Sequence, residues 1–193
     1  MTELPDPARI ESKGLTLLSA LAYVDSRHGP SGRERLLASL DEATRAIVGG
    51  HLLASSWYPF HVQVGLYETI DRLWGKGDLA LCWEVGKFTA EHEASTIHKL
   101  FLKIARLDTW LRVAGTMWGR YYNAGALELG EFGGGNGEVR VRDFHPISKA
   151  FCYDFGGWLW RTAEMSGVSG VVVRHEQCLL DGAPACVWRA SWR

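Results

Sequence analysis

Two stretches near the end of the chain decide the fold. They read SKAFCYDFGGWLWRTAEMSG over residues 148–167 and VSGVVVRHEQCLLDGAPACVW over residues 168–188. The first is expected to form a helix that runs from Pro146 to about Met165. The second is expected to form a β-hairpin, because Asp181-Gly182 is a strong tight-turn signal between two runs rich in apolar residues. A helix followed by a hairpin is therefore predicted for the end of the fold.

Three of the four cysteines lie in these stretches. Residues that flank a turn symmetrically face each other, so Cys178 is expected opposite Cys186, and Cys152 lies on the helix that must pack on the hairpin. Three thiols with His175 and Glu176 beside them predict a structural zinc site. Strand parity places Glu176 on the face of Cys178, so His175 would need a β-bulge to join the site. The alternatives are a Cys178–Cys186 disulfide and three buried apolar thiols.

Composition indicates a globular protein. The chain has 193 residues, 47% hydrophobic and 22% charged, with a net charge of -1. Such a charge argues against a nucleic-acid or anionic-membrane surface, and no apolar run is long enough to span a membrane. The polar start MTELPDPARIESKG is not a signal peptide. A cytoplasmic location is expected, where clustered cysteines more often bind metal than form disulfides.

The pattern before the final stretches is first helical and then alternating. Five or six amphipathic helices are expected over residues 12–124, after a flexible arm at 1–11. The breaks include Gly29-Pro30, and Pro59 is expected at a first helical position.

Two strands follow, "ALELGEF" and "EVRVRDF", joined by the glycine loop "GGGNG". A strand follows that loop, so it is a hairpin turn rather than a phosphate-binding loop, which needs a helix after it. The hairpin, helix and hairpin of residues 125–193 predict one four-stranded antiparallel sheet. The fold class is therefore α+β, a single domain with an N-terminal helical bundle packed on that sheet.

The order of elements resembles a superfamily that includes 4-vinyl reductase domains, TRAPP vesicle-tethering subunits and haem-NO-binding domains. Within it, the chain most resembles a family of similar length common in myxobacteria. The residues that carry this match are Lys13-Gly14, Trp57-Tyr58-Pro59, Gly125, Cys178, Gly182, Cys186 and Trp192. The resemblance covers most of the chain, and its motifs lie in the last third.

The resemblance also bears on the cysteines. The 4-vinyl reductase domains of phenol-type sensors hold zinc with the pattern C-x25-C-x7-C and a fourth, acidic ligand three residues before the middle Cys. Cys152, Cys178 and Cys186 have these spacings, and His175 occupies the fourth position, with Glu176 next to it. Imidazole is a good zinc ligand, so the resemblance favours the set Cys152, His175, Cys178 and Cys186 over one with Glu176.

Haem is not expected from the resemblance. The haem-binding members carry their proximal His on a helix after an Asp, and the matching stretch here, LDTWLRV at residues 107–113, has no His.

A ligand pocket is expected instead among the aromatic residues. The resemblance implies a small apolar pocket between the helix before the sheet and the sheet itself, and the nine Trp of the chain suit one. Its expected lining is His98, Trp110, Trp118 and Phe132. The alternative is that these aromatic residues only fill the core.

No catalytic motif is found, so the chain is predicted not to be an enzyme. We expect a sensory or ligand-binding domain that binds a small apolar, aromatic or lipid-like molecule, in a cavity of a few hundred Å³, and signals through a partner protein. The resemblance implies a homodimer formed through the N-terminal helices. The alternative is a TRAPP-subunit-like scaffold without a diffusible ligand, whose core would be filled. A role in tetrapyrrole metabolism rests on the family name alone.

Overall fold

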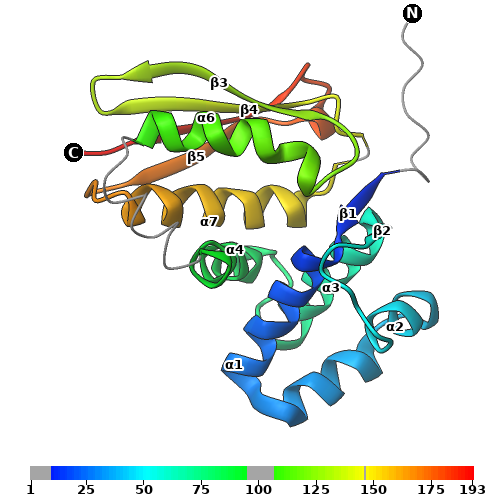
Figure 1. Cartoon of the computed structure of the whole chain (residues 1–193). Coiled ribbons are helices and arrows are strands. Elements are labelled where there is room, and N and C mark those ends of the chain that lie inside the picture. The colour runs from blue at the N-terminus through cyan, green and yellow to red at the C-terminus, as the bar shows by residue number, and fades with distance from the viewer. Residues whose placement is uncertain (1–9, 95–106, 146) are drawn as a thin grey trace, which may run out of the picture.

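The structure is a computed structural model that describes residues 10–94, 107–145 and 147–193. Helices come first and are followed by two β-hairpins with a helix between them (Figure 1). The helical part contains α1 (Gly14–Ser39), α2 (Glu42–Val48), α3 (Phe60–Trp74), α4 (Ala80–Glu93), α6 (Leu107–Met117) and the 3-10 turn η2 (Trp118–Arg120). The second part contains β3 (Ala126–Gly133), β4 (Asn136–Arg142), α7 (Lys149–Met165), β5 (Val172–Gln177), the 3-10 turn η3 (Leu179–Asp181) and β6 (Cys186–Ser191). The predicted α+β class is confirmed.

The second part forms one antiparallel sheet with the strand order β3-β4-β6-β5. The two hairpins join where β4 pairs with β6, and Val139 lies opposite Trp188 in that pairing. Residues alternate between the two faces along each strand, so Val139, Val141 and Trp188 are buried against the helices. Figure 1 shows α6 and α7 on the same side of the sheet, with α4 beyond α7.

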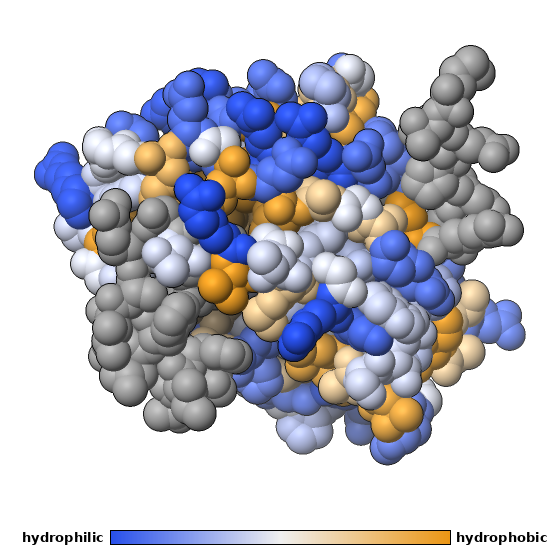
Figure 2. All heavy atoms as spheres, turned by 45° about the horizontal axis from the view of Figure 1, so that its top comes forward, coloured by the Kyte–Doolittle hydropathy of each residue, from blue (hydrophilic) through white to orange (hydrophobic). Residues whose placement is uncertain are grey.

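The other face of the sheet is charged. Arg189 lies opposite Glu138 in the pairing of β4 with β6, and its Nε is 3.0 Å from Glu138 Oε2. Arg142 and Glu128 form a second ion pair at 2.9 Å. In Figure 2, hydrophilic residues accordingly gather toward the top, with single apolar residues between them. The sheet therefore separates a buried layer of helices from a solvated face.

A small second sheet was not expected. β1 (Glu11–Lys13) pairs with β2 (Trp57–Pro59), and Lys13 Nζ lies 3.7 Å from the centre of the Trp57 ring. Ile10 is buried and Glu11 begins β1, so these two residues of the predicted arm at 1–11 are packed against the fold. Three-residue strands carry too little alternation for a sequence pattern to reveal them.

The helix boundaries differ from the prediction in three places. Gly29 leaves the helical conformation with φ 64°, but the helix resumes at once, so Gly29-Pro30 bends α1 rather than ending it. The predicted second helix in fact ends at Ser39, and α2 starts anew behind the Asp41 cap. Pro59 precedes α3 as its N-cap instead of being the first helical residue.

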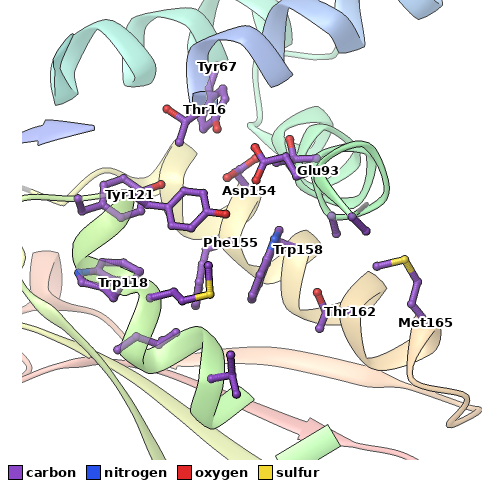
Figure 3. Close-up of a pocket in the computed structure, with 17 residues that line it drawn as sticks. Thr16, Tyr67, Glu93, Trp118, Tyr121, Asp154, Phe155, Trp158, Thr162 and Met165 are labelled. Carbon is purple, nitrogen blue, oxygen red and sulfur yellow. The ribbon is translucent and has the colours of Figure 1, made fainter. Parts of the chain in front are cut away.

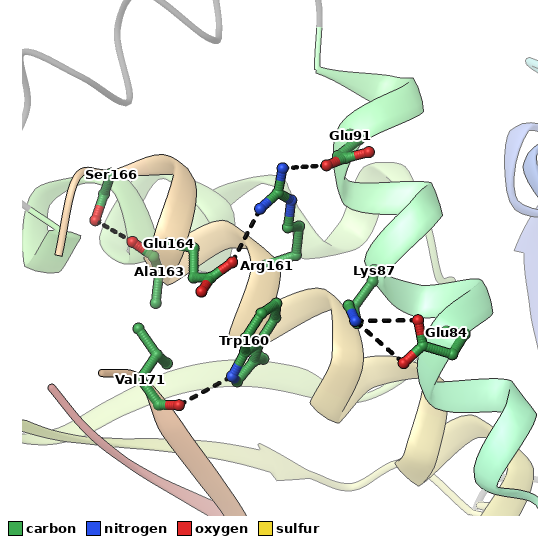
Figure 4. Close-up of polar contacts among 9 residues, drawn as sticks. All are labelled: Glu84, Lys87, Glu91, Trp160, Arg161, Ala163, Glu164, Ser166 and Val171. Atoms are coloured by element: carbon green, nitrogen blue, oxygen red, sulfur yellow. Dashed lines mark hydrogen bonds and ion pairs between the residues drawn. The ribbon is translucent and has the colours of Figure 1, made fainter. Parts of the chain in front are cut away.

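Helices α4 and α7 cross in backbone contact. A Cβ on Gly86 would lie 1.8 Å from the carbonyl oxygen of Asp154, and a Cβ on Gly157 would lie 2.0 Å from that of Trp83. Side chains beside the crossing hold it in place (Figure 4). Lys87 Nζ stacks 4.8 Å from the Trp160 ring centre. Glycine at the contact therefore sets how closely α4 and α7 approach each other.

Beside the crossing, Arg161 of α7 lies between two carboxylates. It forms an ion pair with Glu91 of α4 and another, at 2.9 Å, with Glu164 of its own helix (Figure 4). Trp160 Nε1 donates to the carbonyl oxygen of Val171, at 2.9 Å, which ties α7 to the start of β5. In the described part of the chain, no helix is both long and apolar enough to cross a membrane.

Candidate functional site

Four predicted ligand residues come together where the start of α7 meets the last hairpin. One ligand atom each from Cys152, His175, Cys178 and Cys186 lies within 4.8 Å of all the others. Cys152 comes from α7, His175 from β5, and Cys178 and Cys186 from the two sides of the turn. The three thiols are buried and His175 is exposed. We call this group the cysteine cluster.

A β-bulge places His175 in the cluster. His175 pairs with Trp188 and Gln177 pairs with Val187, so the register shifts by one residue at Glu176. Such a shift moves the preceding side chains to the other face of the strand. The imidazole of His175 then stacks on the Trp188 ring, 4.4 Å between centroids. The bulge predicted as the condition for His175 is present.

The spacing of the cluster suits a metal better than a disulfide. The Sγ atoms of Cys178 and Cys186 are 3.6 Å apart, and all four cysteines of the chain are free thiols. A disulfide needs about 2.05 Å. Two thiolates on one zinc lie roughly 3.8 Å apart, since each Zn–S bond is about 2.3 Å in a tetrahedron.

The thiols of the cluster differ in acidity. Hydrogen bonding from Cys152 lowers the pKa of Cys186 to about 5, and the backbone N–H of Leu179, 3.2 Å from Cys186 Sγ, acts in the same direction. The bond to Cys186, with burial, raises the pKa of Cys152, and burial raises that of Cys178. Cys186 is therefore the thiol of the cluster that loses its proton most readily, and a thiol binds metal as its thiolate.

A cavity of about 160 Å³ lies among α4, α6 and α7 (Figure 3). The face of α7 that carries Phe155 and Trp158 forms one wall, and Trp118 of η2 forms another. Most of the lining is apolar. The remaining lining residues are Thr16, Tyr67, Thr89, Ala90, Glu93, Ala94, Val113, Met117, Tyr121, Tyr122, Leu127, Asp154, Thr162 and Met165. The cavity is smaller than the few hundred Å³ expected for a sensor.

The predicted ligand residues divide into three groups. Trp118 lines the cavity and is 6% exposed. Phe132 does not, because β3 carries it to the far end of the sheet, where its ring packs on Trp192 at 5.1 Å between centroids. That prediction is corrected. His98 and the side chain of Trp110 lie outside the described residues.

Two acidic residues line the cavity that the sequence interpretation did not select. Glu93 ends α4 and Asp154 lies in α7, and Figure 3 shows their carboxyl groups next to each other. Burial, and then the neighbouring Glu93, raise the pKa of Asp154 well above its ordinary value. Burial raises the pKa of Glu93 to about 7, although Ser19 donates a 2.7 Å hydrogen bond to its Oε1. We call Glu93 and Asp154 the acid pair.

Glu93→Gln is expected to change how stability depends on pH. The folded-state pKa of about 7 exceeds the ordinary 4.5, so between these values the native protein holds a proton that the unfolded chain releases. The free energy of unfolding therefore falls as pH rises from about 4.5 to 7.

Glutamine does not titrate, so the Glu93→Gln variant does not lose stability in this way as the pH rises. Its melting temperature should exceed that of the wild type at pH 8 and equal it near pH 4.5. The gain at pH 8 should be roughly 1–3 kcal/mol. Thermal melts at both pH values measure it, with Glu84→Gln on the exposed side of the same helix as the control. An equal difference at the two pH values would contradict the account.

A network of polar side chains lies at the end of the cavity that is lined by Thr16, Tyr67 and Tyr122. Gln63 of α3 accepts a hydrogen bond from Thr16 at 3.2 Å and donates to the hydroxyls of Tyr67 at 3.0 Å and Tyr122 at 3.3 Å. The Tyr67 hydroxyl also acts on Asp154, whose pKa it lowers against the larger effect of burial. The network fixes the orientation of the two hydroxyls, so the cavity has an apolar body and a polar end.

Comparisons with known proteins show the fold. No protein-family model and no curated protein matches the sequence. Among solved structures, an H-NOX protein from S. oneidensis in the Fe(II)NO ligation state has a TM-score of 0.71 at 13% identity, over 94% of this chain and 99% of that chain. The NMR structure of an H-NOX domain from Shewanella oneidensis in the Fe(II)CO ligation state also has a TM-score of 0.71 at 13% identity, over 94% and 98%. An unliganded Fe(II) H-NOX protein from K. algicida reaches 0.69 at 12% identity, over 94% and 96%.

These comparisons correct one expectation, that the domain has no haem. H-NOX domains are the haem-NO-binding members of the superfamily that the sequence resembles. The names of the solved proteins include Fe(II). The missing His at residues 107–113 was therefore too little to exclude haem.

The described lining does not fit a haem at its present size. Haem iron is held by His, Cys, Met or Tyr. Of these types the described lining has Met117, Tyr121, Tyr67 and Tyr122, and none of its residues is His or Cys. A volume of about 160 Å³ is close to that of a cavity of about 150 Å³ that holds one benzene ring.

Proposed function

We propose that this chain is a non-enzymatic sensory domain that binds a small aromatic or apolar molecule in the cavity among α4, α6 and α7. The observation that carries the proposal is the cavity itself, which has aromatic walls and a polar end built from Tyr67 and the acid pair. Ligand sites are typically apolar concavities with a few placed polar groups. The volume suits a single-ring molecule rather than a long acyl chain.

The output of the sensor is proposed to run through α6. Val113 and Met117 place α6 on the cavity wall, and the same helix packs on β3 of the sheet. A ligand that contacts α6 would favour one position of this helix over another, and a partner protein or a second copy of the chain would bind that position. A scaffold without a ligand would need no such cavity, so the cavity favours the sensor.

We further propose that the cysteine cluster holds a structural zinc ion. Four ligand atoms within 4.8 Å of one another, three of them thiol sulfurs, are the set that a closed tetrahedral site requires. With four protein ligands, no position remains for a water or substrate, so the site would join α7 to the last hairpin and take no part in chemistry.

Filling the cavity is expected to abolish ligand binding without unfolding the protein. Ala90 of α4 is buried and lines the cavity, so Ala90→Leu places three more carbon atoms inside it. Benzene and ethylbenzene, titrated into the wild type by calorimetry, should bind, and the variant should bind neither while its melting temperature stays within about 4 °C. Ala43→Leu, at an exposed position of α2, is the matched control.

Three results of this titration are informative. Binding by the wild type and the control alone supports the proposal, and equal binding by the Ala90→Leu variant contradicts it. Haem is titrated in parallel, and a new absorption band that the leucine variant lacks would identify haem as a ligand of this cavity. Native mass spectrometry of the purified protein reports any retained ligand, metal and partner copy together.

A further inference from the structure

We infer that the cavity recognises an organic cation, a single-ring molecule with a short side chain that ends in an ammonium group. This inference rests on the proposed function and names the ligand class of the same site. Four features carry it: unpartnered buried polar atoms, an acid pair without a described cationic partner, aromatic walls and the volume.

Three buried polar atoms that line the cavity lack a hydrogen-bond partner. They are Asp154 Oδ1, Thr89 Oγ1 and Thr162 Oγ1, on residues that are 6%, 8% and 1% exposed. Figure 3 shows Asp154 and Thr162 on the cavity side of α7. Buried polar groups in native proteins are almost always satisfied, so atoms left open around one space indicate that a ligand satisfies them.

The oxygens of the acid pair and of Thr89 can all accept hydrogen bonds, so a molecule with several N–H donors suits this end of the cavity. A carboxylate only accepts hydrogen bonds, and an ammonium group has three donors and no acceptor. Thr89 lies one helical turn before Glu93 on α4, and both residues line the cavity together with Asp154. Three acceptors match the three donors of an ammonium group.

The charge of the pair points the same way. Among the described residues, no Lys, Arg or His forms an ion pair with either of them, although nearby Glu91 has one with Arg161. A cationic ligand would supply the positive charge that these carboxyl groups lack as a partner. Its hydrogen bonds to them would be strong, because the dielectric constant inside a protein is low.

The aromatic walls suit the rest of such a ligand. Phe155 and Trp158 stack at 5.7 Å between centroids on the cavity side of α7, and Trp118 faces Phe155 edge-on at 6.2 Å. Aromatic faces attract both an aromatic ring and the alkylammonium carbons next to it. The volume of about 160 Å³ leaves room for little beyond one ring.

Three probes of nearly equal shape test the inference: 2-phenylethylamine, 2-phenylethanol and ethylbenzene. Their affinities are measured by calorimetry at pH 7.5 and fixed ionic strength with the wild-type chain. The amine should bind at least about tenfold more tightly than the alcohol, because hydrogen bonds to charged groups are the stronger ones. Glu93→Gln should remove this advantage and leave the affinity for ethylbenzene unchanged, whereas Glu84→Gln should behave as the wild type.

Each outcome separates this inference from the proposal on which it rests. Equal affinities for amine and alcohol, or an amine affinity that Glu93→Gln leaves unchanged, overturn the cation inference while the cavity remains a ligand site. If none of the three probes binds to the wild type, the proposed function fails as well. Asp154→Asn is a second variant with the same expected loss, and its fold is checked by its thermal melt.

Discussion

Cys186→Ser is expected to abolish zinc binding and to lower the melting temperature by roughly 8–16 °C. The reason is that structural zinc binding is coupled to folding. Loss of one ligand therefore removes the binding free energy that stabilises the packing of α7 on the last hairpin. A loss of about 4 kcal/mol is typical of a removed metal site, and 1 kcal/mol corresponds to about 2–4 °C for a chain of this length. Metal analysis of the purified protein and thermal melts measure the two effects.

The control for this variant is Cys82→Ala. Cys82 is also a buried thiol, but it lies in α4, and its Sγ is 3.6 Å from the carbonyl oxygen of Tyr67, outside the cysteine cluster. This variant should keep one zinc per chain. A wild-type protein without zinc, or zinc retained at full occupancy by the Cys186→Ser variant, would show that the cluster is no metal site.

Gly157→Ala is the second change with a large expected effect, a loss of about 3 kcal/mol or more. The added Cβ would lie 2.0 Å from the carbonyl oxygen of Trp83, and this backbone atom cannot move without shifting α4. The melting temperature should fall by at least about 6 °C. The affinity for the ring probes should also fall, because Asp154 lies at this crossing and Glu93 lies about two turns after Gly86 on α4.

Gly119→Ala provides the comparison. A Cβ on Gly119 would meet no heavy atom within 4 Å, so this variant differs in chain flexibility alone. It should melt within about 2 °C of the wild type. If the two alanine variants had the same stability, the close approach of α4 and α7 would not be the feature that positions the acid pair.

The sequence was most informative where local rules apply. The turn signal at Asp181-Gly182 places Cys178 opposite Cys186 whatever the rest of the fold does, and the structure has these two sulfurs 3.6 Å apart. The alternation of apolar and polar residues likewise predicted the strands and their common sheet. Strand parity alone favoured Glu176 over His175, because the bulge that turns His175 inward depends on how β5 pairs with β6.

The acid pair could not be predicted in the same way. Glu93 lies in the polar run TAEHEAS, which favours a solvated helix end, and only the crossing with α7 turns it toward the cavity. Asp154 carried a weak signal, a single acid among the apolar residues of FCYDFGGW. That signal fits an exposed helix face equally well, since burial depends on packing between distant segments. The same holds for Gly86 and Gly157, whose role is visible only at the crossing.

A crystal structure of the protein saturated with its tightest-binding ring probe tests the central claim most directly. The account predicts that the ring lies among Trp118, Phe155 and Trp158, with the side chain of the probe directed toward Glu93 and Asp154. A probe bound elsewhere on the protein, with the space among α4, α6 and α7 filled by protein side chains, would contradict it.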